Sequence, residues 1–331
     1  MKNEHPEVKF GKTGVLLINL GTPDSTNWWD IRKYLKEFLS DRRVIEVNPF
    51  IWQIILNLFI LTFRPSKTAK AYRKIWMKDK NMSPLRHYSE MQAMKLNSKI
   101  GDERIIVDYA MRYGNPSIKS KINDLKIKGC ENLVILPLYP QYAAATTATV
   151  CDEVYRSLSK MRWQPSLQII PHYESEPLYI EAIIKSIEVK LNQINWKPDL
   201  IMASYHGIPK RYFEKGDPYH CYCHKTTRLI SEKMKSEIPI ITTFQSRFGP
   251  QEWLQPYTDK TLENLPKEGK KNILVICPGF ASDCVETLEE ISIEGKSSFI
   301  DQGGENFEFI PCLNDSERHI DLFSHLVKRY V

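Results

Sequence analysis

The feature that most constrains the fold is a set of four short apolar runs, each rich in Leu or β-branched residues and each ending at a glycine, a proline or a polar turn. The runs cover residues 15–20, 133–138, 200–204 and 273–276. Such runs are typical of strands buried on both faces. After the first run, apolar residues recur at helical spacing, at Trp28, Ile31, Leu35, Phe38 and Leu39. Strands that alternate with helices predict βαβ units, and hence an α/β fold with parallel sheets.

The chain also carries a weak internal repeat. The stretches ENLVILPLYPQYAAATTATVCDEV and KNILVICPGFASDCVETLEEI share the order charged residue, Asn, strand, Pro, small-residue loop and helix. A chain of 331 residues has room for two lobes of similar design. We therefore expect a first lobe over residues 1–162, a second over 163–314, and a final helix over 315–331 that packs back on the first lobe.

Ligands of open α/β sheets bind beyond the carboxyl ends of the strands. This rule points to four loops, residues 19–24, 139–147, 205–209 and 278–286. His206 directly follows the third apolar run, and Gly207 and Pro209 shape a tight turn after it. Imidazole is the side chain best suited to move protons near neutral pH or to bind a transition metal. The alternative interpretation is a histidine satisfied by a loop carbonyl.

Acidic residues follow the fourth run. Glu286, Glu290 and Glu294 stand at i, i+4 and i+8, a spacing that lines one face of an α-helix. Like charges at this spacing repel, so the alternative is a solvated acidic face. Asp283 and Glu286, however, begin the helix directly after a buried strand, which is a pocket position. A ladder of carboxylates there suits a divalent cation passing along it.

Several function classes lack their motifs in this sequence. It contains no phosphate-binding loop G-x-x-x-x-G-K-[ST], no G-x-G-x-x-G after a strand and no H-E-x-x-H, so it shows no sign of ATP or dinucleotide use. A net charge of +6 with Lys and Glu intermixed does not indicate a nucleic-acid-binding protein. The polar amino terminus lacks a signal-peptide pattern, and we expect a cytoplasmic protein whose seven cysteines are thiols or metal ligands.

One segment is unusually apolar, PFIWQIILNLFILTFRP over residues 49–65. It is shorter than the ~20 residues of a membrane-spanning helix. One interpretation is a buried helix, or a helix at the lip of a binding site, with Gln53 and Asn57 as a polar stripe. The other is an interfacial helix in peripheral contact with an anionic membrane from Phe50 to Phe63. Basic residues flank the segment and favour that contact, namely Arg42, Arg43, Arg64, Lys67 and Lys70.

Almost the whole chain resembles the ferrochelatase family, and in particular its Gram-negative bacterial type. The resemblance rests on GVLLINLGTP, LKEFLSDRRV, LPLYPQY, SYHGIPKRYFEKGDPY, TFQSRFGPQEWLQPYTD and CPGFASDCVETLEEI. It implies two Rossmann-like lobes with parallel four-stranded sheets and a porphyrin cleft between them. It also implies an ATP-independent lyase that inserts Fe²⁺ into protoporphyrin IX, the last step of haem biosynthesis, with no obligatory cofactor. We expect a monomer.

The resemblance also assigns roles to residues. His206 and Glu286 match the catalytic and metal-binding positions, and Glu290, Glu294 and Asp283 form the acidic relay beside them. Porphyrin-lining positions are Leu20, Tyr72, Arg112, Tyr113, Tyr139 and Trp253, and positions that contact the propionates are Arg64, Lys67 and Ser83. Propionates are anions, which gives Arg64 and Lys67 a physical reason to be there.

Metallation exchanges two pyrrole protons for one Fe²⁺. We expect the enzyme to bend the macrocycle so that nitrogen lone pairs become exposed on one face. His206 then accepts protons, and Glu286 orients it or relays them. Alternatives are a coproporphyrin chelatase, a sirohydrochlorin or cobalt chelatase, and a non-enzymatic porphyrin carrier. SDCVETLEEI lacks the extra histidines that the cobalt and sirohydrochlorin enzymes tend to use, and Cys284 stands where some relatives have a histidine.

The cysteines raise a separate question. Ala144 stands where the animal-type iron–sulfur site has a cysteine, and no cysteine-rich tail is present, so the resemblance excludes that type of cluster. Cys221 and Cys223, in HCYCHK, and Cys151 are instead candidate ligands of a different 2Fe–2S cluster. The fourth ligand is left open among Cys130, Cys277, Cys284 and Cys312. Free thiols, or zinc on the Cys/His group, are the alternatives.

Overall fold

The computed structural model describes residues 8–234 and 236–331, which fold into two four-stranded sheets with every strand pair parallel. The first sheet has the order β2-β1-β3-β4, with β1 at Lys12–Thr22, β2 at Ile105–Gly114, β3 at Cys130–Pro137 and β4 at Ser166–Ile169. The second has the order β6-β5-β7-β8, with β5 at Leu200–His206, β6 at Ile240–Gln245, β7 at Asn272–Ile276 and β8 at Asn306–Phe309.

The two sheets therefore repeat one topology, as the internal repeat of the sequence predicted. β3 and β7, the third strands of their sheets, carry the repeated stretches. The four apolar runs became β1, β3, β5 and β7, which are the interior strands. The edge strands β4 and β8 span only four residues each, and no residue of β4 is fully buried, so they lack the apolar run that reveals a buried strand.

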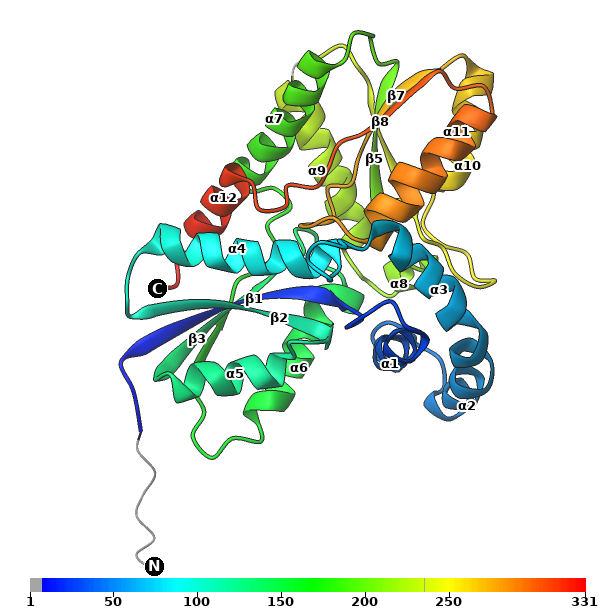
Figure 1. Ribbon diagram of the computed structural model, residues 1–331. Helices are drawn as coiled ribbons and strands as arrows, with labels where there is room; N and C mark the ends of the chain where they lie inside the picture. The colour runs from blue at the N-terminus through cyan, green and yellow to red at the C-terminus, as the bar shows by residue number, and fades with distance from the viewer. Residues whose placement is uncertain (1–7, 235) are drawn as a thin grey trace, which may run out of the picture.

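Helices cover both faces of each sheet (Figure 1). The first lobe holds α1 (Trp28–Leu39), α2 (Pro49–Ile55), the π-helix η1 (Leu56–Ile60), α3 (Leu61–Ile75), α4 (Pro84–Ile100), α5 (Ile118–Ile127), the π-helix η2 (Ala144–Ala148) and α6 (Thr149–Leu158). The second holds α7 (Pro177–Gln193), α8 (Lys210–Glu214), α9 (Tyr219–Met234), α10 (Thr258–Asn264), the 3₁₀-helix η3 (Leu265–Glu268), the π-helix η4 (Glu286–Gly295), α11 (Lys296–Asp301) and α12 (Glu317–Val327).

One boundary expected from the sequence needs correction. β4 pairs with β3, so a first lobe that ended at residue 162 would lose the fourth strand of its own sheet. The first sheet closes at Ile169, and α7 then enters the second lobe. The last helix, α12, lies against α4 of the first lobe as well as α7, and Lys95 and Lys99 of α4 form ion pairs with Asp315 and Asp321.

The two lobes share one apolar core and several buried polar contacts. The largest cluster of buried side chains contains Val15 of β1 together with Ile201 of β5. Across the joint, the buried side chain of Gln92 donates to the Ala281 carbonyl at 3.3 Å, to the Ser282 hydroxyl at 2.9 Å and to the Asn314 carbonyl at 2.8 Å. These contacts hold the carboxyl ends of β1 and β7 in a defined relation, which matters because the predicted site residues come from both lobes.

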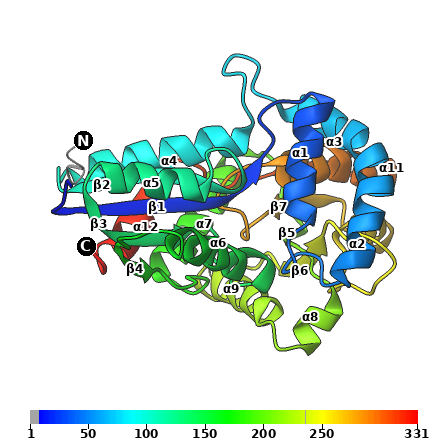
Figure 2. The same cartoon turned by 90° about the horizontal axis from the view of Figure 1, so that it is seen from below.

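The apolar segment forms α2, η1 and the start of α3, beside α1 at the carboxyl end of β1 (Figures 1 and 2). Leu56 and Leu61 are buried, but a row of larger side chains is exposed, comprising Phe50, Ile51, Ile54, Ile55, Leu58, Phe59 and Phe63. Phe50 is 77% exposed and Phe63 is 73% exposed, so the segment is not a buried helix. Within the described part of the chain, no helix is long and apolar enough to cross a membrane.

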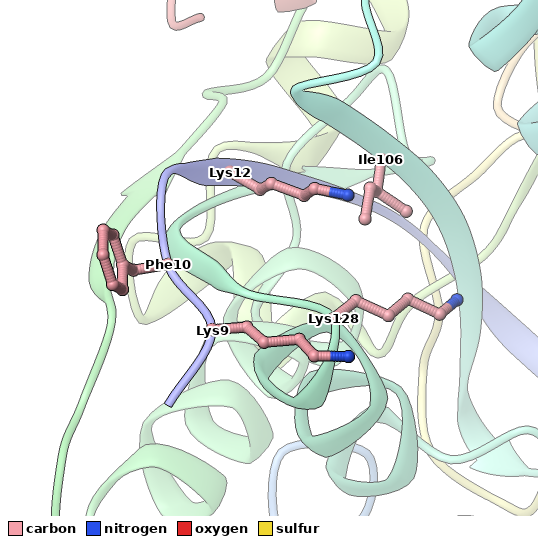
Figure 3. Close-up of a pocket in the computed structure, with 5 residues that line it drawn as sticks. All are labelled: Lys9, Phe10, Lys12, Ile106 and Lys128. Carbon is pink, nitrogen blue, oxygen red and sulfur yellow. The ribbon is translucent and has the colours of Figure 1, made fainter. Parts of the chain in front are cut away.

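A surface hollow lies at the amino-terminal end of β1, at the end of the first sheet opposite to the apolar segment. Lys9, Lys12, Lys128 and Ile106 line it, and Phe10 of the same segment points away from the lysines (Figure 3). Its lysines come from the amino end of β1 and the turn before β3. This hollow is therefore separate from the strand-end loops in which the candidate residues lie.

Candidate active site

The turn after β5 holds His206 in one tautomer. Its Nδ1 lies 2.6 Å from the carbonyl oxygen of Gly207. Because a carbonyl oxygen only accepts hydrogen bonds, Nδ1 is the protonated nitrogen of the neutral ring, and Nε2 keeps its lone pair. Nδ1 of His206 is thus satisfied by a loop carbonyl, as one interpretation of the sequence proposed. Nε2 is left available for chemistry.

Gly207 lets this turn lie close against β6 and Trp253. A Cβ atom at position 207 would come 2.9 Å from the carbonyl oxygen of Gln245 and 3.2 Å from Cε3 of Trp253. Glycine alone avoids that crowding. The backbone N–H of Gly207 donates to the same Gln245 carbonyl at 2.8 Å, which ties His206 to the end of β6. Trp253, predicted as a porphyrin-lining residue, thus lies beside the histidine turn.

Gln245 and Ser246, at the end of β6, position the acidic residues. The buried Gln245 amide accepts from the Ser204 hydroxyl at 2.8 Å and donates to the Glu286 carbonyl at 2.8 Å and to the Glu290 carboxylate at 3.2 Å. The backbone N–H of Ser246 donates to the same carboxylate at 2.7 Å, and its hydroxyl donates as well. Burial raises the pKa of Glu290, while these hydrogen bonds and the nearby His206 oppose the rise.

The acidic ladder differs from the row expected on an α-helix. Residues Glu286–Gly295 form the π-helix η4, in which each hydrogen bond spans one residue more than in an α-helix. Glu290 faces Gln245 and Ser246, whereas the side chain of Glu294 is 61% exposed and lies 3.6 Å from Lys74. π-Helical turns are rare and occur often at functional sites.

Two acidic residues beside the ladder are engaged in contacts of their own. Glu289 pairs with Lys74 of α3 at 2.7 Å, which joins η4 to the first lobe. Asp283, predicted as part of the relay, is buried and accepts hydrogen bonds from the Thr287 hydroxyl at 3.0 Å and from the Asn314 amide at 2.7 Å. These bonds make Asp283 an anchor for the start of η4.

The first lobe contributes three buried tyrosines and an arginine. Burial raises the pKa values of Tyr34, Tyr72 and Tyr139, and the negative charge of Glu286 adds to each rise. Burial lowers the pKa of Arg64, and Glu286 opposes that shift. Val285, the residue before Glu286, packs against the apolar cluster that contains Tyr34 and Tyr72, so the start of η4 lies beside these two tyrosines. Within the described residues, the Tyr139 hydroxyl and Nη1 of Arg64 are buried without a hydrogen-bond partner.

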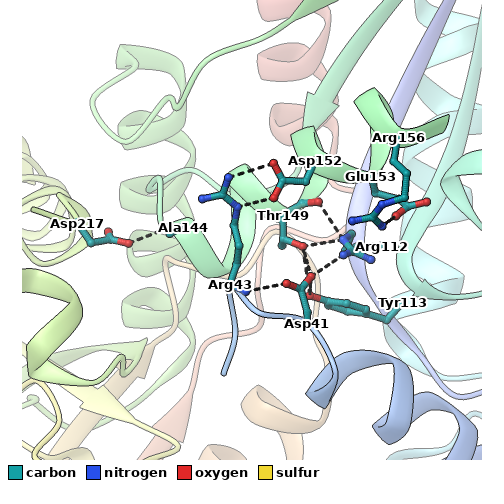
Figure 4. Close-up of polar contacts among 10 residues, drawn as sticks. All are labelled: Asp41, Arg43, Arg112, Tyr113, Ala144, Thr149, Asp152, Glu153, Arg156 and Asp217. Carbon is teal, nitrogen blue, oxygen red and sulfur yellow. Dashed lines mark hydrogen bonds and ion pairs between the residues drawn. The ribbon is translucent and has the colours of Figure 1, made fainter. Parts of the chain in front are cut away.

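Arg112 and Tyr113, predicted to line the porphyrin, lie in a buried polar network (Figure 4). Nη2 of Arg112 lies 2.5 Å from the Asp41 carboxylate, and its Nε donates to the Thr149 hydroxyl at 2.7 Å. The Tyr113 hydroxyl donates to the same Asp41 carboxylate at 2.8 Å, and Tyr113 is fully buried. The network joins the end of α1 to β2 and α6, so these two side chains stabilise the first lobe.

Three further predicted residues occupy different environments. Ser83 is buried, and its hydroxyl accepts from the backbone N–H of Arg86 as the N-cap of α4. Lys67 is exposed on α3, one turn from Arg64. Leu20, near the end of β1, packs partly buried against the clusters that contain Tyr139 and Tyr72.

The candidate cluster ligands do not converge in the structure. Cys221 is exposed and Cys223 is fully buried, on opposite sides of α9, and Cys151 is half-buried on α6. Burial raises the pKa of Cys223 and so disfavours the thiolate that metals bind. Across residues 8–234 and 236–331, no group of three or more His, Cys, Asp or Glu side chains is close enough to hold a metal ion.

Sequence reasoning missed Gln245, Ser246 and Tyr34, and also the Lys74–Glu289 pair. Gln245 and Ser246 lie in TFQSRFG, where a polar pair directly after an apolar strand was the available signal. Tyr34 lies on the buried face of the helix predicted after the first strand, so it resembled an ordinary core residue. No pattern along the chain indicates that Lys74 meets Glu289, because the two are joined only by packing of α3 on η4.

Comparison with solved structures defines the class of the fold. SirB from Bacillus subtilis with Fe³⁺ aligns with a TM-score of 0.54 at 12% identity, over 96% of this chain and 95% of that one. CbiX, described as the terminal enzyme of sirohaem biosynthesis in denitrifying bacteria, aligns with a TM-score of 0.50 at 10% identity, over 97% and 99%. The two-lobed parallel fold, with histidine and carboxylates at its strand ends, is thus a chelatase fold.

Sequence comparison identifies the family within that class. The ferrochelatase family model matches residues 12–331. Three relatives named ferrochelatase are similar to the chain over nearly its full length. The protein from Allorhizobium ampelinum is 54% identical over 99% of this chain and 96% of the relative. Those from Rhizobium meliloti and Francisella tularensis subsp. novicida are 55% and 51% identical, each over 98% of this chain and 97% of the relative. The chain belongs to the ferrochelatase family, lyases of haem biosynthesis that insert Fe²⁺ into a porphyrin.

Proposed function

We propose that this chain inserts Fe²⁺ into protoporphyrin IX, with His206 and Glu286 as the catalytic pair. The observation that carries the assignment is the hydrogen bond from Nδ1 of His206 to the Gly207 carbonyl, which leaves the basic Nε2 available next to the acidic π-helix. A base with a fixed tautomer and a carboxylate nearby is the arrangement that proton abstraction requires.

The reaction exchanges two protons for one metal ion. The porphyrin bends, one pyrrole N–H bond breaks, and Nε2 of His206 accepts that proton as Fe²⁺ bonds to the exposed nitrogen lone pairs. The proton passes to Glu286 or Glu290, which frees Nε2 for the second pyrrole proton. Both protons then leave along η4 toward the exposed Glu294, so free-base porphyrin and Fe²⁺ yield haem and two protons. Asp283 anchors η4 in this scheme.

Porphyrin binding draws mainly on the first lobe. Arg64 is held over the ring of Phe248, with its guanidinium carbon 4.4 Å from the ring centroid. Its buried Nη1 has no partner among the described residues, so a propionate carboxylate satisfies it, and Lys67 one turn away suits the second propionate. Tyr72, Tyr139, Leu20 and Trp253 supply the apolar and aromatic surface against the macrocycle.

The exposed apolar row from Phe50 to Phe63 gives the protein a peripheral contact with a membrane. An apolar porphyrin then passes between the bilayer and the site without crossing water. Exposed apolar surface of this extent, flanked by Arg42, Lys67 and Lys70, fits an anionic lipid surface. We place such a protein at the cytoplasmic side of the membrane, as a monomer.

A 2Fe–2S cluster at Cys151, Cys221 and Cys223 stays a separate prediction with its own test. A cluster requires a fourth ligand and a turn of Cys223 out of the core, because Cys223 is fully buried. Protein purified without oxygen is brown and carries two additional irons if the cluster exists. Colourless protein with full activity would leave the three residues as ordinary thiols.

The test of the proposed function is steady-state iron insertion by the purified chain. Fe²⁺ with protoporphyrin IX should give continuous turnover to protohaem, whereas a porphyrin carrier would bind one equivalent and stop. Coproporphyrin and sirohydrochlorin, each offered with Fe²⁺ or Co²⁺, test the other chelatases. Faster turnover of either substrate than of protoporphyrin IX would reject the proposed substrate.

A further inference from the structure

Helix α9 carries a histidine pair that the chelatase site does not use. His220 and His224 are four residues apart, so they lie on one face of the helix, and their ring centroids are 4.4 Å apart. The cysteines of the same HCYCH stretch point to opposite sides, with Cys223 in the core and Cys221 exposed. The structure thus brings the histidines together and separates the cysteines.

The surroundings of the pair leave both imidazoles accessible. His220 is half-buried and stacks on Phe244 of β6, with ring centroids 5.7 Å apart, while His224 is exposed. Neither ring has a hydrogen-bond partner among the described residues. Each imidazole in its neutral form therefore has a free nitrogen lone pair, which is the form that binds metals.

We propose that His220 and His224 form a surface site for a late first-row divalent ion such as Zn²⁺, Ni²⁺ or Cu²⁺. Two imidazoles at i and i+4 lie on one face of a helix, so both can bind the same ion at the usual metal–nitrogen distance of about 2.0–2.1 Å. Imidazole ligands favour these ions over Fe²⁺ in the usual order of affinities. The described residues offer no third side chain in place, so water completes the coordination.

The pair is separate from the catalytic residues. It packs on Phe244, whereas Gln245, the next residue of β6, reaches Glu286 and Glu290 on η4. Successive residues of a strand point to opposite faces of the sheet, so β6 itself lies between the two sites. The inference therefore does not depend on the proposed reaction.

The experiment measures how many Zn²⁺ ions the full chain binds in competition with a chromophoric chelator. All variants also carry His206→Ala, so that zinc bound at the catalytic histidine is not counted. His224→Ala in that background should lose one bound ion, and His220→Ala should do the same. His87→Ala, which removes a histidine outside the pair, should bind as the background does. Cu²⁺ should broaden the ring proton signals of His220 and His224 selectively in NMR spectra.

The zinc stoichiometry of each variant supports or overturns the proposed histidine site. Unchanged zinc stoichiometry in His224→Ala overturns the site, and because His224 is exposed this variant should keep its fold and melting temperature. His220→Ala removes packing on Phe244, so its zinc result counts only with an unchanged circular dichroism spectrum. Loss of the ion in Cys221→Ser would overturn the two-imidazole assignment. Iron insertion by His224→Ala, with His206 intact, should match the unmodified chain.

Discussion

The backbone N–H and the hydroxyl of Ser246 both donate to the carboxylate of Glu290. To make the two bonds, Ser246 adopts a φ of +64°, a left-handed conformation that costs a residue with a Cβ about 1 kcal/mol or more. Strain of this kind persists where surrounding contacts determine it, and such positions cluster at functional sites. The two bonds from Ser246 therefore favour the ionised form of Glu290 and oppose the rise in its pKa that burial causes.

Replacing Ser246 should shift the pH dependence of iron insertion. The Ser246 hydroxyl opposes the rise in the Glu290 pKa that burial causes. Its loss in Ser246→Ala raises that pKa, so a larger fraction of Glu290 is protonated at a given pH. If ionised Glu290 is the active form, the acid limb of the kcat profile moves to higher pH. Measuring kcat across pH in the variant and the unmodified chain checks this.

Ser246→Gly separates the carboxylate effect from backbone strain. Glycine also lacks the hydroxyl, so its acid limb should move as in Ser246→Ala. Glycine adopts positive φ without a steric penalty, so it should melt at a higher temperature than the alanine variant. An unmoved acid limb in both variants would show that Glu290 does not titrate in catalysis.

The three ladder positions should contribute unequally to turnover. Glu286→Gln keeps the shape but removes charge and basicity at the start of η4, and we expect kcat to fall by about 10²-fold or more. Glu290→Gln should lower kcat by an intermediate factor, and Glu294→Gln least, because its exposed carboxylate is screened by water. Near-normal turnover in all three would mean that η4 presents only a solvated acidic face.

His206→Ala should abolish iron insertion, leaving less than about a tenth of the original turnover, because it removes the proton acceptor. Porphyrin binding, followed by fluorescence quenching, and the melting temperature should change little, since within the described residues the ring bonds to the adjacent Gly207 carbonyl alone. His87→Ala, at an exposed contact with Lys80, is the matched control and should keep full activity.

Several parts of the fold and site were predictable because their signals are local. An apolar run such as residues 133–138 identifies an interior strand, since a strand covered on both faces has no polar position. A histidine directly after such a strand, as at His206, marks the ligand edge of a parallel sheet. The duplicated strand–Pro–loop–helix pattern of β3 and β7 indicated the two similar lobes.

Other parts depend on packing between distant segments and left no local signal. The α-helical spacing of Glu286, Glu290 and Glu294 concealed a π-helix, because the same residues fit either helix. The bonds from Gln245 and Ser246 to η4 likewise join segments that are distant in sequence. Arg112 was predicted to line the porphyrin, and nothing in the sequence indicated that its guanidinium donates to Asp41, 71 residues away. A charged side chain cannot be assigned to substrate until its partners in the fold are known.

The Asp41 network should dominate the acid stability of the first lobe. Burial alone would raise the pKa of Asp41, but hydrogen bonds from Thr149, the Arg43 backbone and Tyr113, with the charge of Arg112, lower it overall. A carboxyl whose pKa is lowered in the folded state contributes stability above its unfolded pKa of about 3.9, and that stability is lost as the pH falls below it.

Asp41→Asn should lower the free energy of unfolding at pH 7 by about 3–5 kcal/mol, because it leaves the buried Arg112 without its counter-charge. Arg43→Gln is the matched comparison. It breaks a pair with Asp152 whose side chains are about 40% exposed (43% and 39%), and it should cost less than about 1 kcal/mol. Urea unfolding measures both, and equal losses would contradict the assignment of the network.

Membrane contact should depend on the exposed row of α2, η1 and α3. Burying one phenylalanine side chain contributes about 1.5–3 kcal/mol, so replacing Phe50, Phe59 and Phe63 together with serine should reduce vesicle binding by at least about tenfold. Flotation with vesicles rich in an anionic lipid measures binding, and added salt should weaken it through the flanking Arg and Lys residues.

Ile127→Ser, at a position 72% exposed on α5, is the control and should float as the unmodified chain does. Flotation unchanged by the triple replacement would exclude this surface as the membrane contact and leave it as a cover for the porphyrin alone.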